Sequence, residues 1–418
     1  MAEADFGGAK MSSKHHKSNQ QSNFTKYPNS VDIRPHVVLI YPYVRRDRDA
    51  VGLCVAQLSE YLNTKSGMNT HILSIEEVSP TVKRLLQMKS PVQNIIEKAH
   101  RAYSQFAFLA RAFITMTTFR TTPQLIVITV DAPTGIGLPV QLARWMNPQL
   151  QHVAWVMDLY RLAETEHRTK LDQMRALVEA NTIAKADRVV TLGECMRERL
   201  KRTIDREVDI LPIWQDETWI TPKPRHYQQA ATSSPIDLVY SGTARSGIHP
   251  LREMAEAVQS YDDPRRLRLI IRGMGDEVDQ LRSYVPATSR CVIFDDLVPA
   301  HEVPAKLAAA DIHLVTLAES KTGTCVPSKA YAAMAAGRPV LYYGVPDGQA
   351  ARDILEAGCG FIVEPGSNIQ KAIESAAKSD AQLDEMGKSG YSFFIQNRSL
   401  DAMGRRWSDY LSRMARSD

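Results

Sequence analysis

The residue types and spacing that could do chemistry are concentrated between Thr322 and Pro339, in TGTCVPSKAYAAMAAGRP. A turn of small residues, 322–324, leads to Lys329 and to a helix of small residues that ends at Gly337. A glycine-containing turn before a helix leaves backbone N–H groups directed at one point, with the positive end of the helix dipole behind them. The pattern predicts an anion site, most often for phosphate, although an ordinary strand–helix unit with a tidy cap has the same signature.

Strands and helices alternate on both sides of this stretch, which predicts an α/β protein with parallel sheets. Buried-type strands such as HVVLIYPYV (36–44) and DIHLVTL (311–317) are apolar throughout, as parallel strands covered on both faces usually are. Residues 216–235 carry prolines and polar residues with little periodicity, so we interpret them as a linker between two doubly wound domains. Such a pair of domains leaves a cleft in which a ligand would bind. The predicted organisation is as follows: a disordered tail (1–33), a first domain (34–215), the linker, a second domain (236–392) and a C-terminal helix (393–418) that packs back on the first domain.

Composition narrows the class of protein. The 418 residues are 44% hydrophobic and 23% charged, which is typical of a soluble globular chain, and a net charge of only +4 argues against a dedicated nucleic-acid binder. The five cysteines are far apart and form no CxxC pair, which indicates a reducing compartment and neither a disulfide framework nor a zinc site. The chain has no apolar run of about 20 residues that would span a bilayer, and its N-terminus lacks the apolar core of a signal peptide. We therefore expect a cytoplasmic protein.

Residues 81–122 are basic and aromatic, with seven Lys or Arg side chains against a single acid, Glu97. The spacing predicts one or two amphipathic helices. They either pack on the sheet with solvated charges or contact an anionic membrane at the inner face of the cell membrane.

Other familiar motifs are absent or weak. GMGDE (273–277) lacks the third glycine of a dinucleotide fingerprint, and the chain has neither GxxxxGK[ST] nor GxSxG. No His or carboxylate cluster has metal-ligand spacing, so we predict no metal site and no cofactor. His313 lies in an apolar strand, where a satisfied core histidine is the more common interpretation.

Several strings in fixed order resemble the glycosyltransferase family 4 enzymes, which have the GT-B fold. They include WVMDLY, ADRVVTLGECMRERL, VYSGTARSGIHPL, VPSKAYAAMAAGRPVLYYG and EAGCGFIVEPG, and they extend over residues 36–400. The nearest resemblance is to the branch that builds bacterial capsule, colanic-acid and O-antigen polysaccharides. It implies two facing Rossmann-like domains, the first holding a lipid-linked or glycan acceptor and the second a nucleotide-sugar donor, linked to UDP or GDP. It also implies a retaining, metal-independent hexosyl transfer.

The resemblance assigns roles to individual residues. Asp158, Arg245 and Lys329 match positions near the reacting sugar and the donor phosphates, although Asp158 could instead be a helix cap and Arg245 a solvated loop charge. Gly52 would allow close approach of a phosphate or acceptor to the first domain. The remaining donor-binding positions lie on loops of the second domain: Gly242, Thr243, Gly273, Leu297, Val298, Gly323, Thr324, Cys325, Val326 and Ser328.

The chain also departs from the family pattern. Two glutamates that many members carry eight positions apart fall here on Thr324 and Ala332, which cannot accept hydrogen bonds as carboxylates do. Glu319 is the nearest upstream carboxylate, and the histidine that often precedes the acidic position is Met157. The RRDRD loop (45–49) fits a diphosphate, an acidic sugar or a plain charged surface equally well. Two alternatives to a transferase therefore stay open: a nucleotide-sugar epimerase of related fold, and a catalytically degenerate partner subunit.

Overall fold

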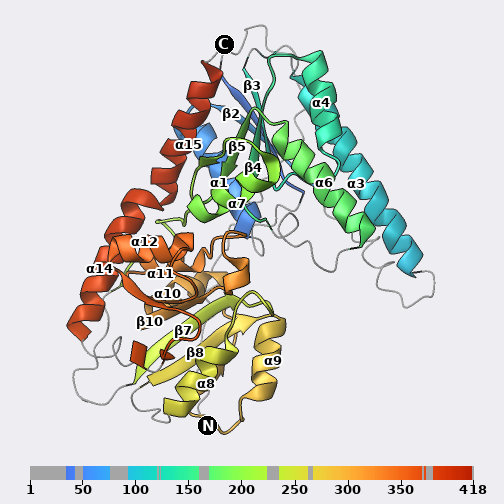
Figure 1. Ribbon diagram of the computed structural model, residues 1–418. Coiled ribbons are helices and arrows are strands. Elements are labelled where there is room, and N and C mark those ends of the chain that lie inside the picture. Colours follow the sequence, from blue (N-terminus) through green and yellow to red (C-terminus); the bar gives the residue numbers. More distant parts are fainter. Residues whose placement is uncertain are drawn as a thin grey trace, which may run out of the picture. The chain divides into compact units, whose positions relative to one another are not determined.

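The computed structural model describes residues 34–42, 50–75, 93–119, 122, 124–159, 169–223, 235–261, 267–369, 371–372 and 380–416. The predicted tail, the RRDRD loop, residues 81–92 of the basic run and residues 224–234 of the linker lie outside these ranges. The described chain forms two six-stranded sheets in which every strand pair is parallel, as the apolar strands predict (Figure 1).

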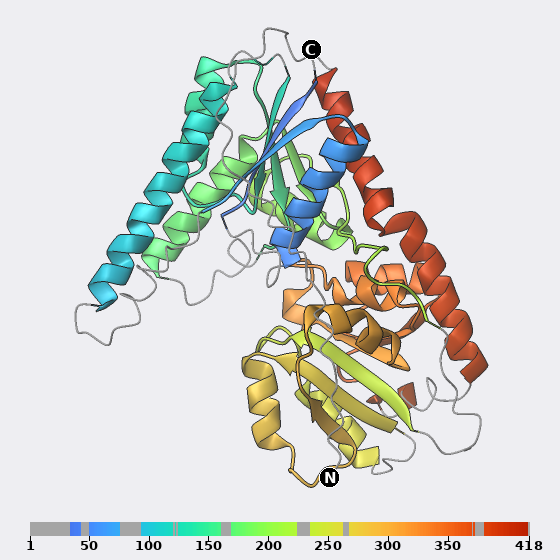
Figure 2. The same ribbon diagram turned by 180° about the vertical axis from the view of Figure 1, so that it is seen from behind.

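The first sheet has the order β2-β1-β3-β4-β5-β6. Its inner strands, β1, β3, β4 and β5, are mostly apolar and buried, because helices cover both sides of a parallel sheet, whereas the edge strands β2 and β6 are more exposed. The strands are β1 (His36–Ile40), β2 (Asn69–Leu73), β3 (Leu125–Val130), β4 (Gln151–Val156), β5 (Arg188–Thr191) and β6 (Asp209–Ile210). The helices of this half are α1 (Ala50–Lys65), α3 (Gln93–Thr118), α4 (Gly137–Met146), α6 (Lys170–Ala184) and α7 (Glu194–Ile204). Figure 2 shows α1 and the pair α3 and α6 on different sides of the sheet.

The second sheet has the order β12-β11-β10-β7-β8-β9. Strand order reverses between β7 and β10, and the carboxyl ends of strands at such a reversal are where open α/β sheets bind ligands. Its strands are β7 (Ile236–Thr243), β8 (Leu267–Met274), β9 (Val292–Asp295), β10 (Ile312–Thr316), β11 (Val340–Tyr343) and β12 (Gly360–Val363). Its helices are α8 (Arg252–Tyr261), α9 (Asp276–Tyr284), α10 (Val303–Ala308), α11 (Lys329–Ala335) and α12 (Gln349–Ala357), with 3-10 turns at Ala300–Glu302 and Glu319–Lys321.

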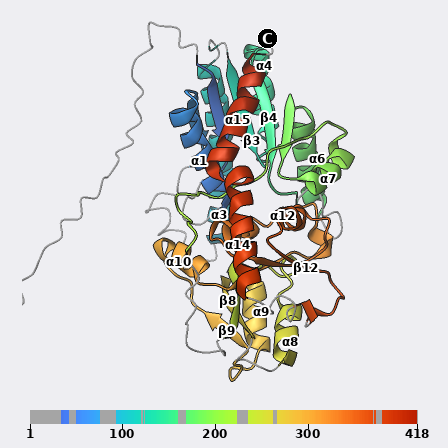
Figure 3. The same ribbon diagram turned by 90° about the vertical axis from the view of Figure 1, so that its left-hand side faces the viewer.

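Two consecutive helices complete the described chain: α14 (Asp380–Asn397) and α15 (Leu400–Ala415), which follow one another end to end (Figure 3). Helix α14 contacts α11 and α12 of the second half, and α15 contacts α1 of the first. The ring of Trp407 lies 4.8 Å from that of Trp155 on β4, between centroids, and both are fully buried. Residues 398–399 connect the two helices, so the domain boundary expected at 392 falls inside α14. The division of the chain into domains remains a prediction.

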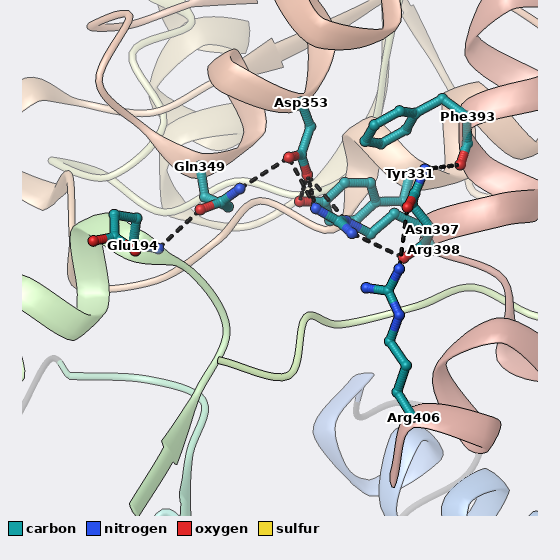
Figure 4. A network of polar contacts seen from close by, with 8 residues as sticks. All are labelled: Glu194, Tyr331, Gln349, Asp353, Phe393, Asn397, Arg398 and Arg406. Atoms are coloured by element: carbon teal, nitrogen blue, oxygen red, sulfur yellow. Dashed lines mark hydrogen bonds and ion pairs between the residues drawn. The ribbon is translucent and has the colours of Figure 1, made fainter. Parts of the chain in front are cut away.

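A buried ion pair fixes the junction of these helices (Figure 4). Arg398 donates to both carboxylate oxygens of Asp353 on α12, at 2.8 and 2.9 Å. Gln349 donates to the same carboxylate at 2.9 Å, and its side-chain oxygen accepts the backbone N–H of Glu194, also at 2.9 Å. Because Glu194 begins α7 of the first half, this network ties that helix to α12 and to the start of α15. Removing one partner of a buried ion pair is costly, so this network holds the helices that it joins firmly in place.

Candidate active site

The carboxyl ends of β7 and β8 approach each other so closely that only glycine fits. Gly242 has a φ of 110° and Gly275 a φ of 115°, both in the left-handed region. A Cβ atom on Gly273 would lie 2.4 Å from the carbonyl oxygen of Gly242, and one on Gly275 would lie 2.1 Å from that of Ala244. The glycines predicted as ligand-binding positions therefore lie together in the two loops that follow β7 and β8, where the strand order reverses.

Lys329, the first residue of α11, reaches these two loops from the neighbouring loop. Its Nζ donates to the carbonyl oxygen of Thr243 at 2.9 Å and lies 5.0 Å above the ring of Tyr240. Burial lowers the pKa of Lys329 to about 8; Cys325 opposes the shift and Arg245 adds to it. Among the described residues, no carboxylate contributes to this pKa, so the ammonium group lacks the anion that would favour its charge.

Arg245 lies on the loop that follows β7, with an exposed side chain. Its backbone N–H donates to Nδ1 of His249 at 3.1 Å, so that nitrogen carries no proton. Burial and then the charge of Lys329 lower the pKa of His249 to about 3, the charge of Arg245 adds a smaller lowering that its backbone hydrogen bond opposes, and the ring stays neutral at pH 7. Since both cations act on His249, the structure brings Arg245, Lys329, Gly242 and Thr243 together as the sequence predicts, with His249 as a member that sequence reasoning does not single out.

The turn before Val326 has a different role from the predicted one. The backbone N–H and hydroxyl of Thr324 both donate to the carbonyl oxygen of Lys321, at 2.9 and 2.7 Å. Its own carbonyl oxygen accepts the N–H of Leu159 at 2.7 Å. Gly323 has a φ of 77°, and a Cβ atom there would lie 2.8 Å from the carbonyl oxygen of Cys195 on α7. The prediction that Thr324 offers its backbone to a phosphate is thus corrected, because the turn packs against the first half of the chain.

Other predicted donor-binding positions are dispersed. Leu297 and Val298 follow β9 at the same edge of the sheet, and Leu297 is half exposed (50%). Cys325 and Ser328 are half-buried, and Val326 is buried. Gly52 is buried inside the first turn of α1, and its predicted role in the close approach of a ligand stays a prediction.

Two aspartates meet at the carboxyl ends of β3 and β4. Asp131 accepts the backbone N–H groups of Met157 and Asp158 on one carboxylate oxygen, at 2.7 and 3.2 Å. Asp131 and Ala132 have positive φ values of 49° and 27°, which cost conformational energy in residues with a side chain. Burial first, and then the carboxylate of Asp158, raise the pKa of Asp131 well above its ordinary value. The sequence signal for Asp131 is only an acid at a strand end in VDAPTG, which by itself indicates a loop.

This aspartate pair adjoins the second half of the chain. Leu159, the residue after Asp158, donates to Thr324 of the turn before α11. The sequence-predicted Asp158 is therefore next to a residue that contacts the turn of the second half. His313, in contrast, is a core residue: its Nε2 lies 2.9 Å from the carbonyl oxygen of Leu307, and burial lowers its pKa to about 4. Among the described residues, no group of three or more His, Cys, Asp or Glu side chains is arranged to hold a metal ion.

The amino-acid sequence is similar to those of known glycosyltransferases. Residues 236–379 match the family model described as glycosyl transferases group 1. The chain is similar to the probable glycosyltransferase WbjE of Pseudomonas aeruginosa, at 27% identity over 225 residues, 52% of this chain. The match spans about half (55%) of the length of WbjE.

Solved structures share the fold along most of the chain. Sucrose-phosphate synthase from Thermosynechococcus elongatus has a TM-score of 0.65 at 16% identity, covering 92% of this chain and 100% of its own. Anabaena Alr3699/HepE in complex with UDP has a TM-score of 0.60 at 13% identity, covering 91% of this chain and 100% of its own. The chain thus has the two-domain α/β GT-B fold, and its second half is similar in sequence to the group 1 glycosyltransferases.

Proposed function

We propose that the protein is a glycosyltransferase that moves a sugar from a nucleotide-diphosphate donor to a lipid-linked or polysaccharide acceptor in cell-surface glycan synthesis. The observation that carries the proposal is the meeting of Arg245 and Lys329 at the glycine-containing loops that follow β7 and β8. Two cations and a neutral histidine at a strand-order reversal are suited to a diphosphate, and no carboxylate in the described part of the chain pairs with Lys329. UDP and UDP-glucose are the ligands named for the structures of Anabaena HepE, and we extend this donor class to the present chain.

The chemistry follows from the charge that develops during transfer. As the bond between the sugar and the diphosphate breaks, negative charge grows on the leaving phosphate oxygen, and fixed cations stabilise it more in the transition state than in the substrate. In this proposal Arg245 and Lys329 perform that task without a metal ion or a further cofactor, and the sugar keeps its anomeric configuration. Asp158, with Asp131 behind it, faces the acceptor. Glu319, exposed in the turn after β10, would accept hydrogen bonds from donor hydroxyls in place of the carboxylates absent at Thr324 and Ala332.

A nucleotide-release assay with a panel of UDP- and GDP-sugars tests the proposal. We expect one donor to release its nucleotide slowly without acceptor and faster with a lipid-linked glycan extract. Conversion of the donor to an epimer without release would instead identify a nucleotide-sugar epimerase. Binding without release or conversion would identify a degenerate partner subunit, the alternative raised by Thr324 and Ala332.

A further inference from the structure

Three helices on the first sheet expose large apolar side chains to solvent. Helix α3 buries Phe108, Ala112 and Met116 against the sheet, at spacings of four residues that define a single stripe. On its opposite side Tyr103 and Phe106 are 71% and 72% exposed. An amphipathic helix of a soluble domain normally places polar residues on its outer side, so packing within the fold does not explain the apolar outer side of α3.

Helices α4 and α6 repeat this arrangement. On α4, Val140 and Ala143 are buried while Leu142 and Trp145 are exposed, Trp145 to 81%. On α6, Ile183 is buried while Met174 and Leu177 are 62% and 69% exposed. Helix α4 contacts both α3 and α6, and a Cβ atom on Gly137 would lie 2.4 Å from the hydroxyl oxygen of Thr182.

We call this surface the three-helix face and define it by six side chains: Tyr103, Phe106, Leu142, Trp145, Met174 and Leu177. Eleven of the seventeen exposed large apolar side chains of the described residues lie on α3, α4 and α6. Scattered exposed apolar residues need no explanation, whereas a concentration of this kind marks an interaction surface.

Basic side chains outnumber acidic ones on the described parts of these helices. Arg111, Lys170 and Arg175 are exposed on these helices. Over residues 102–119, 137–146 and 170–184 the acids are Glu179, which is buried, and Asp172, which pairs with Arg175 at 3.3 Å. The surface is therefore apolar and basic, which complements a surface that is apolar and anionic.

A second copy of the chain fits this surface poorly. A two-fold interface brings the same patch of both copies together, so the basic side chains of one copy would face those of the other. A bilayer containing anionic lipid offers the opposite charge, and exposed Trp and Tyr side chains favour the boundary between headgroups and acyl chains. Among the described helices, none is long and apolar enough to cross a membrane.

We propose that the three-helix face docks the protein on an anionic lipid surface, with α3, α4 and α6 lying on the headgroup layer. The proposal extends the contact expected for residues 81–122, because α3 belongs to that run whereas α4 and α6 lie outside it. It does not rest on the proposed catalytic function, because vesicle binding is measured without donor or acceptor.

Vesicle flotation with the full chain tests the proposal. The vesicles contain phosphatidylcholine alone, or phosphatidylcholine with roughly one-third phosphatidylglycerol. We expect recovery only with the anionic vesicles and weaker recovery at high salt, because salt screens the basic residues. Replacing Leu142, Trp145 and Leu177 together by Ser should lower the partition coefficient at least about tenfold, since it removes the inserted apolar surface.

The matched control replaces two exposed apolar residues of other helices, Leu355→Ser on α12 and Ile395→Ser on α14, and should leave binding unchanged. A thermal melt of each variant checks the fold, which exposed sites should preserve. Equal recovery with neutral and anionic vesicles would overturn the proposal, as would a triple variant that binds like the control. A concentration-dependent dimer that the triple variant abolishes, with no vesicle binding by either protein, would assign the face to self-association instead.

Discussion

The ammonium group of Lys329 donates a hydrogen bond to the carbonyl oxygen of Thr243 at 2.9 Å, which joins the start of α11 to the end of β7. These residues are 86 positions apart in the chain, and β7 and β10 are adjacent strands on either side of the reversal in strand order. A cation held at this point by a neutral carbonyl, with no carboxylate from the described ranges beside it, remains available for an anionic ligand.

Replacing Arg245 by Ala should weaken the binding of UDP or GDP by about 1.5–3 kcal/mol, the range for a hydrogen bond to a charged group. Calorimetric titration measures the change in dissociation constant. Arg290→Ala is the matched control, because Arg290 is also exposed but precedes β9 at the amino end of the strand. Equal dissociation constants for the Arg245 variant and the unaltered protein would remove Arg245 from the donor site.

Nucleotide binding should weaken as the pH rises through the pKa of Lys329, which is about 8. A bound diphosphate favours the charged ammonium, so the ligand binds best below that pKa, and we expect a loss of roughly tenfold between pH 7.5 and 9.5. Lys329→Arg keeps its charge over this range and should flatten the pH profile. A steep profile that persists in the Arg variant would show that another group titrates.

Asp131→Asn should make the protein less sensitive to alkaline pH. The pKa of Asp131 is raised in the folded protein, so between about pH 4 and that raised value the folded state holds a proton that the unfolded state releases. Stability therefore falls as pH rises in this window. An asparagine keeps the acceptor for Met157 and Asp158 without the charge, and the melting temperature above pH 7 should rise by at least about 2–4 °C, equivalent to about 1 kcal/mol. Identical curves of melting temperature against pH for both proteins would contradict the burial of this carboxyl group.

Transfer activity should survive EDTA, because in this account Arg245 and Lys329 stabilise the leaving diphosphate. The rate in EDTA is compared with the rate after adding back magnesium or manganese, and the two should agree within error. If EDTA abolishes activity and either metal restores it, the leaving diphosphate is stabilised by a metal ion and not by the two cationic side chains alone.

The sequence predicts much of the fold because the parallel strands are short apolar runs, such as LIVITV of β3, between helices of amphipathic spacing. Arg245, Lys329, Gly242 and Gly273 are assigned by the family resemblance, and the turn and helix start around Lys329 also have a local signature. Asp131 could not be predicted from the sequence, since its role depends on the pairing of β3 with β4, which brings it under the backbone of Met157 and Asp158. The contacts of Thr324 differ from the prediction for a similar reason. Its backbone N–H donates to the carbonyl oxygen of Lys321, three residues earlier, and no spacing pattern in the sequence shows this bond.

The outer stripes of α4 and α6 also escape sequence reasoning. An apolar residue such as Leu142 or Leu177 is read as core until the structure shows which face of the helix the sheet covers. The exact ends of helices are also hard to predict from sequence: α1 begins at Ala50, two residues before Gly52.

Hydrogen–deuterium exchange of the full chain, with and without saturating UDP or GDP, tests the central claim most directly because it locates the bound nucleotide. The account predicts slower exchange in peptides that cover 241–249, 273–277 and 325–331, and a smaller change in the Arg245→Ala variant at the same nucleotide concentration. Protection confined to the first sheet, or no protection by either nucleotide, would contradict a donor site at the carboxyl ends of β7 and β8.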